Sequence, residues 1–271
     1  DENVDIPYDA ERIHADSLTI YAGFISGLAH AGMPEPELDR REREAAVENP
    51  GDPRNDLAGI QPDRLARDLL DPAHERIEQL RKVGFTTAHV VPRGGMLPGT
   101  GAVVSLAGSD GSEMIVKSAE GLFARFGTAP DMYPETEMGV LAKFRQLYRE
   151  AERRQRARER FAANPEGLSR PPQDPVHQAF LPVINGEQSI FFHTEDALSL
   201  HRAINLHAET EAPMVLTGLR QSFETVEALQ ETDLPLLLTL DLPEEPPAKS
   251  DTAETDDIDP RAYDVDLRTE S

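Results

Sequence analysis

The sequence predicts an α/β fold with a parallel sheet, and the prediction depends on two observations. Segments typical of strands and helices alternate over residues 188–240, in the order strand, helix, strand, helix, strand, and that spacing is characteristic of βα units. An expected helix from residue 71 and the β-branched strand FTTAHVV at 85–91 show the same alternation earlier in the chain. A length of 271 residues suits one large domain. We therefore expect a single α/β unit.

The elements expected before residue 92 include one long irregular segment. Short strands with turns are predicted over 4–21, ending in LTIY, and an apolar strand over 22–29. The polar, proline-rich text from 33 to 71 predicts a surface excursion. The next helix is expected to begin at Asp71-Pro72, with Asp71 as its N-cap, and to end at Gly84.

The middle of the chain predicts a hairpin and a long helix. AVVSLAG and EMIVK flank an SDG turn at 109–111, which is a hairpin signal. A helix is expected over 134–164, with a charged second half that projects into solvent. Another helix is suggested over 174–186. The residues expected on the apolar stripe of the long helix are Met138, Leu141, Phe144, Leu147 and Tyr148.

Composition excludes several classes of function. The net charge is −23, with 50 acidic and 27 basic residues, so we expect no nucleic-acid partner. No apolar run approaches the roughly 20 residues that cross a bilayer, and the absence of cysteine rules out disulfides and thiolate metal sites. The acidic excess with only four lysines fits a halophilic source, or a GC-rich genome combined with one acidic linker. A soluble protein is therefore expected. The N-terminus reads as truncated, so both a cytoplasmic and an exported location stay open.

Four stretches, in this order, resemble the metal-dependent amidohydrolase superfamily, in its imidazolonepropionase-like branch. They are YAGFISGLAHAG, GFTTAHVVPRGG, GTGAVVSLAG and SIFFHTEDALSLHRAINLHAE. The resemblance covers most of residues 10–242 and implies a TIM-like (β/α)8 barrel with metal at the C-terminal ends of its strands. It implies an incomplete barrel of about seven strands over 21–242. Residues 1–20 would be the edge of a small β domain, and 243–271 an acidic linker or excursion loop.

The resemblance also implies a set of metal ligands, of which this chain holds two. The family pattern has two histidines from strand 1, one each from strands 5 and 6, and an aspartate from strand 8. The second strand-1 position falls on His30 and the strand-5 position on His193, but Leu28 and Thr217 occupy two other ligand positions. Strand 8 is not in the chain. Zinc or another divalent metal is the cofactor implied, with His30 and His193 as candidate ligands, and no metal is expected if the site is degenerate.

Two functions follow from this ligand set. A hydrolytic zinc needs about three protein ligands and an open water position, so we favour an amidohydrolase-like domain that is catalytically impaired. The alternative is part of an active enzyme whose remaining ligands lie outside this chain, acting on a small amide or cyclic amide. An incomplete barrel exposes two sheet edges, so a partner barrel or self-association is expected. His89 is predicted to be structural, and His201 and His207 to lie on the surface.

Overall fold

A single seven-stranded sheet organises the part of the chain that the structure describes. The computed structural model describes residues 8, 18–35, 47–220 and 225–239. Contacts divide the chain into a unit from Asp1 to Thr239 and a second from Leu240 to Ser271, and the predicted acidic linker lies outside the described residues. The strands follow one another across the sheet in chain order. They are β1 (Phe24–Ala29), β2 (Phe85–Val90), β3 (Gly99–Ser105), β4 (Ile115–Arg125), β5 (Ile190–His193), β6 (Met214–Thr217) and β7 (Leu236–Leu237).

Most neighbouring strands are parallel, as predicted. β1 pairs with β2 in parallel, and the pairs from β4 to β7 are parallel as well. β3 is antiparallel to both of its neighbours, which agrees with the predicted hairpin. The helices are α2 (Ala66–Leu69), α3 (Glu75–Lys82), α4 (Gly111–Met114), α5 (Glu137–Ala163), α6 (Pro175–Gln178), α7 (Leu181–Ile184), α8 (Ala197–Thr210) and α9 (Val226–Gln230).

Contacts between strands that are not neighbours show that the sheet curves into an incomplete barrel. The imidazole of His89 on β2 meets the ring of Phe191 on β5 edge-on, with 4.6 Å between the ring centres. The first and last strands also approach each other, because a Cβ atom added at Gly27 of β1 would lie 2.4 Å from Leu237 Cδ1 of β7. Side chains therefore fill the interior, as in other TIM-like barrels.

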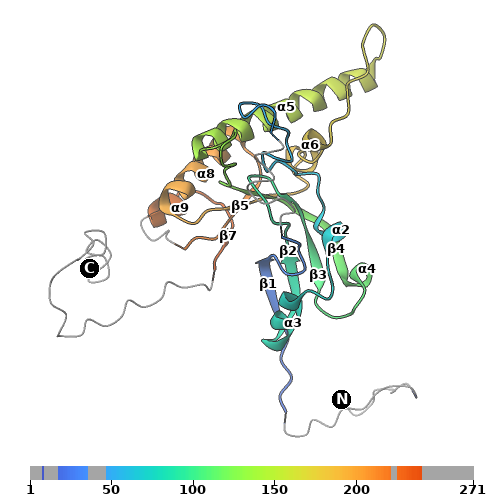
Figure 1. The fold of residues 1–271 in the computed structure, drawn as a ribbon, viewed down its shortest axis with the longest axis vertical. Coiled ribbons are helices and arrows are strands. Elements are labelled where there is room, and N and C mark those ends of the chain that lie inside the picture. Colours follow the sequence, from blue (N-terminus) through green and yellow to red (C-terminus); the bar gives the residue numbers. More distant parts are fainter. Residues whose placement is uncertain (1–7, 9–17, 36–46, 221–224, 240–271) are drawn as a thin grey trace, which may run out of the picture. The chain divides into compact units, whose positions relative to one another are not determined.

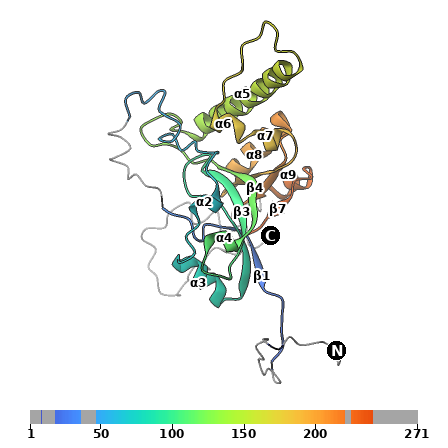
Figure 2. The ribbon, with the colours of Figure 1, turned by 90° about the vertical axis from the view of Figure 1, so that its right-hand side faces the viewer.

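Two groups of helices cover the sheet, and each has its own apolar core. Both views place α3 and α4 together and away from α5–α8 (Figures 1 and 2). The smaller core joins Ile77 of α3 to β2 and β3. The larger core joins α5 and α8 to β4, β5 and β6. At its centre, the ring of Phe144 contacts those of Phe180 and Phe192.

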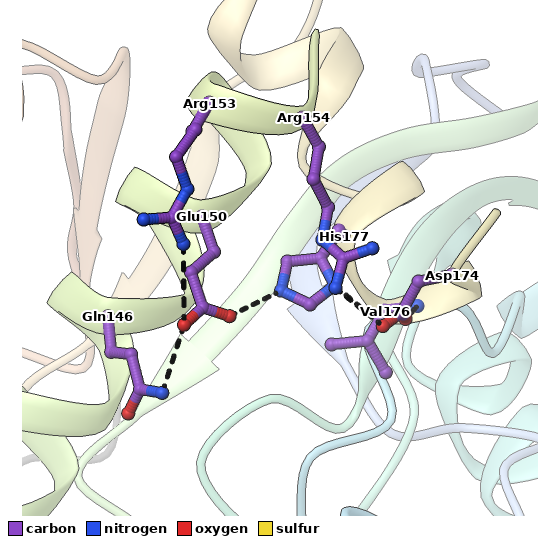
Figure 3. A network of polar contacts seen from close by, with 7 residues as sticks. All are labelled: Gln146, Glu150, Arg153, Arg154, Asp174, Val176 and His177. Atoms are coloured by element: carbon purple, nitrogen blue, oxygen red, sulfur yellow. Dashed lines mark hydrogen bonds and ion pairs between the residues drawn. The ribbon is translucent and has the colours of Figure 1, made fainter. Parts of the chain in front are cut away.

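A buried histidine links α5 to α6 (Figure 3). The imidazole of His177 lies between two carboxylates, with Nε2 3.0 Å from Glu150 Oε2 and Nδ1 2.8 Å from Asp174 Oδ2. The Nδ1 and Oδ2 atoms of the second contact are within ion-pair distance, but their geometry is not that of a hydrogen bond. Asp174 also caps α6 by accepting from the Val176 backbone N–H. This His177 clamp fixes the segment that leads into β5.

The structure corrects four local expectations. Asp71 is not an N-cap, because α3 begins later and the His74 ring accepts from the Arg76 N–H; Asp71 instead accepts from the Ala73 N–H in a turn. Met138 is 59% exposed and does not belong to the buried stripe of α5. The helix suggested over 174–186 is two short helices, α6 and α7.

The fourth correction concerns the segment over 33–71, which is not only a surface excursion. Met33, Leu57, Ile60 and Ala66 are all buried, and Ile60 and Leu65 form parallel bridges to Leu97 and Thr100. Residues 57–66 therefore pack along the side of the barrel next to β3.

The two outer strands carry exposed apolar side chains. Phe24 and Ile25 of β1 are 65% and 72% exposed, and Leu238, next to β7, is 72% exposed. Leu18–Ile20 form no strand, and most of the predicted β edge at 1–20 lies outside the described residues.

Candidate functional site

His30 lies at the carboxyl end of β1, in a tautomer set by one hydrogen bond. Its Nδ1 is 2.8 Å from the Val91 carbonyl oxygen, and because a carbonyl only accepts, Nδ1 carries the proton. Nε2 is therefore left with its lone pair. Burial is the largest cause of the lowered pKa of His30, and the hydrogen bond to Val91 acts in the opposite direction. Repulsion from Arg93 and Arg125, with a smaller contribution from the nearby His193, lowers the pKa of His30 further.

His193 ends β5, and both of its ring nitrogens have partners. Nε2 donates to Glu195 Oε1 at 3.1 Å, and Nδ1 faces the Thr217 hydroxyl at 3.5 Å. The ring lies on Gly218, where an added Cβ would be 2.6 Å from His193 Cε1. Burial lowers the pKa of His193, and Arg125 lowers it too, while the hydrogen bond to Glu195 acts in the opposite direction.

The two predicted ligands lie at the same end of the barrel, with an aromatic ring against both. The ring centre of Phe123 on β4 is 5.9 Å from that of His30 and 6.3 Å from that of His193. Phe123 is 2% exposed. A phenyl ring offers no metal ligand, so this contact makes the space between the imidazoles apolar.

The described residues do not fit a three-ligand metal centre. Among them, no three His, Cys, Asp or Glu side chains are grouped so as to hold a metal ion. Leu28 and Thr217 have no imidazole to offer, and the Nε2 of His193 already donates to Glu195. The positive charge that Arg93 and Arg125 exert on His30 also opposes a divalent cation.

A cavity of about 110 Å³ opens at the ends of β4 and β5. Arg125 and His193 line it from the two strands, and they are register partners. Glu195 stands beside both, with Oε1 3.9 Å from a terminal nitrogen of Arg125. The remaining residues of the lining are Phe126, Glu137, Asp196 and Ser199.

Sequence reasoning missed Arg125, Phe123 and Glu195. The expected hairpin stopped at Lys117, whereas β4 continues to Arg125. Phe123 and Arg125 are two residues apart, so in a strand they lie on the same face. The apolar run Leu122–Ala124 after the glycine at 121 was the signal that could have extended the strand.

His89 is structural, as expected, and buried between two carbonyl groups. Nε2 is 2.8 Å from the Glu120 oxygen and Nδ1 is 3.1 Å from the Gly27 oxygen. Burial lowers the pKa of His89, and the two backbone contacts, which raise it, do not outweigh burial. Of the two histidines predicted to lie on the surface, His201 is exposed and His207 is only partly exposed.

Stability is expected to fall as the pH drops below about 6.5, the pKa of histidine in an unfolded chain. His30, His89 and His193 all have a lowered pKa when folded. At a pH between the folded and the unfolded pKa of these histidines, the unfolded chain binds more protons than the folded chain, so acidification favours unfolding. Urea unfolding between pH 5.5 and 8 measures this slope. His89→Gln should make it shallower than the exposed-site control His201→Gln does; equal slopes in both variants and the wild type would refute the assignment.

Comparison with known proteins shows a shared fold. No protein-family model and no curated protein matches the chain. A solved structure, an amidohydrolase from Thermotoga maritima MSB8, matches with a TM-score of 0.69 and 22% identity over 88% of this chain. The match spans 62% of that protein. At this identity the likeness concerns the fold. No helix in the described part of the chain is long and apolar enough to cross a membrane.

Proposed function

We propose that the chain is an amidohydrolase-like barrel domain that serves in binding and does not carry out metal-dependent hydrolysis. One observation carries the proposal: at the strand ends the chain offers two imidazoles, and no group of three metal-binding side chains exists among the described residues. A hydrolytic zinc needs about three protein ligands to position and ionise its water. The halophilic character and the imidazolonepropionase-like branch remain predictions beside it.

A second candidate is one part of an active amidohydrolase, and the tautomer of His30 favours it. Metal-bound histidines commonly donate their other N–H to a carbonyl or carboxylate, and His30 does so to Val91. The fold match also extends over only 62% of its neighbour. In this alternative, the further ligands come from outside the chain, and the substrate is a small amide or cyclic amide.

Metal content separates the two candidates. We expect the wild-type chain, equilibrated with Zn²⁺ and desalted, to retain far less than one zinc per chain, and His30→Ala and His193→Ala to change this little. Elemental analysis gives the ratio. About one zinc per chain, lost in both variants, would contradict the proposal and favour the active enzyme.

Association through the outer strands remains a prediction. The exposed apolar side chains at β1 and β7 fit either a partner barrel or a second copy of the chain.

A further inference from the structure

Hydrogen-bond donors of two arginines and two histidines lie at the mouth of the barrel, in a protein of net charge −23. β1 is parallel to β2, and β4 is parallel to β5. Because β3 is antiparallel to both β2 and β4, all four of these strands run in the same direction. Their carboxyl ends therefore meet at one end of the barrel. His30 and Arg93 follow β1 and β2, while Arg125 and His193 end β4 and β5. Two guanidinium groups and two imidazoles thus gather where the resemblance implies a cation.

The guanidinium group of Arg125 has N–H donors that no acceptor among the described residues uses. A guanidinium group carries five N–H donors. Among the described residues, the ion pair of Arg125 is with Glu195 at 3.9 Å, which is longer than a hydrogen bond. The side chain lines the cavity beside His193. An acceptor that reached the cavity would find this guanidinium group ready to bind.

Arg93 also has an unused donor. Its Nε is buried and has no hydrogen-bond partner among the described residues, although a terminal nitrogen lies 3.3 Å from the exposed Glu35. Buried N–H groups are rarely left without an acceptor. Arg93 is not in the lining of the cavity at the ends of β4 and β5, so its effect at the mouth is that of its charge near His30.

Glu195 shows where an anion would lie. Of the three carboxylates that line the cavity, Glu137 pairs with an arginine of α8 and Asp196 caps that helix. Glu195 is the one that contacts both donor side chains of the cavity, with Oε1 3.1 Å from His193 Nε2 and 3.9 Å from the guanidinium group of Arg125. The Glu195 side chain is 61% exposed, so it can turn into solvent without losing buried contacts. A carboxylate of the chain itself thus occupies the position between Arg125 and His193.

We propose that the cavity at the ends of β4 and β5 binds the oxyanion of a small molecule, a carboxylate or phosphate group, which displaces Glu195 from Arg125 and His193. Guanidinium groups bind both kinds of oxyanion through paired N–H donors. This inference rests on the proposed function. A zinc ion bound at His193 Nε2 would require that nitrogen to be unprotonated, whereas the anion accepts a hydrogen bond from the proton on Nε2.

Isothermal titration with inorganic phosphate, and separately with acetate, tests the proposal on the full chain at fixed ionic strength with a metal chelator present. The wild type should show saturable binding of at least one of the two anions, and comparing them identifies the preferred group. Arg125→Gln should lower the affinity about tenfold or more, as expected for loss of a charge-assisted contact. Glu195→Gln should raise it several-fold, because it removes the internal competitor.

Arg156→Gln is the matched control, since Arg156 lies on α5 outside the cavity and is 69% exposed; its affinity should equal that of the wild type. If Arg125→Gln misfolds by circular dichroism, Arg125→Lys replaces it and should weaken binding less. The proposal is overturned if neither anion binds, or if binding ignores Arg125 and Glu195. Zinc content is measured separately from anion binding. A wild type that binds neither zinc nor an anion would refute this inference alone. A wild type that retains about one zinc per chain would refute the proposed function.

Discussion

Phe144→Ala is expected to lower the free energy of unfolding by about 3–5 kcal/mol, the range for removing a buried phenyl ring. Phe144 is 1% exposed and lies where α5 meets the sheet. Its ring centre is 5.8 Å from that of Phe180 and 6.1 Å from that of Phe192 on β5. The substitution removes these contacts and leaves a cavity that the neighbouring rings fill only in part.

Met138→Ala on the same helix is the matched control. Its side chain is 59% exposed, so the expected loss is below about 0.5 kcal/mol. Urea denaturation of both variants gives the two free energies. Similar losses in the two variants would mean that α5 packs with a different face from the one described.

His177→Ala is expected to cost about 2 kcal/mol, the second largest effect. The substitution removes the donor to Glu150 and leaves two carboxylates facing each other across the gap between α5 and α6. Losing one partner of a fully buried ion pair costs more, about 3–5 kcal/mol. Glu150 and Asp174 keep 27% and 31% of their side chains exposed, so solvent screening reduces the figure.

The loss in His177→Ala should also depend on pH. Burial raises the pKa of Glu150 and of Asp174, but their contacts with His177 and their other hydrogen bonds outweigh burial and lower both. Carboxylates with a lowered pKa contribute stability above the unfolded value, about 4, and lose it as the pH falls through the folded value. The difference between wild type and variant should therefore shrink below about pH 4. A difference that is constant from pH 7 to 3 would contradict the His177 clamp.

The sequence predicted the second half of the fold well because each element there is periodic and bounded. The strand, helix and strand expected in that order from residue 188 onward are β5, α8 and β6. Met138 was misplaced for a physical reason: it lies at the first turn of α5, ahead of the point where the helix meets the core. Asp71 was misplaced because an aspartate before proline suits a turn as well as a helix cap.

The site was predictable only in part. The resemblance pointed to His30 and His193, and the strand order brings both to one end of the barrel. The charges around them come from Arg93, just after β2, and Arg125, the last residue of β4, and no sequence pattern singled out either arginine. Glu195 is two residues past a strand, and no periodic pattern indicates that its carboxylate turns back to His193.

The most direct test of the account is zinc content before and after restoring the two missing ligands. Leu28→His with Thr217→His places imidazoles at both positions where the chain departs from the implied pattern. We expect the wild type to hold far less than one zinc per chain and the double variant to gain zinc, with His193→Ala abolishing the gain. The contrary result is a wild type that retains about one zinc per chain and loses it in His30→Ala and in His193→Ala. That result would show that a metal centre forms while Leu28 and Thr217 are in place, and it would contradict the proposed function.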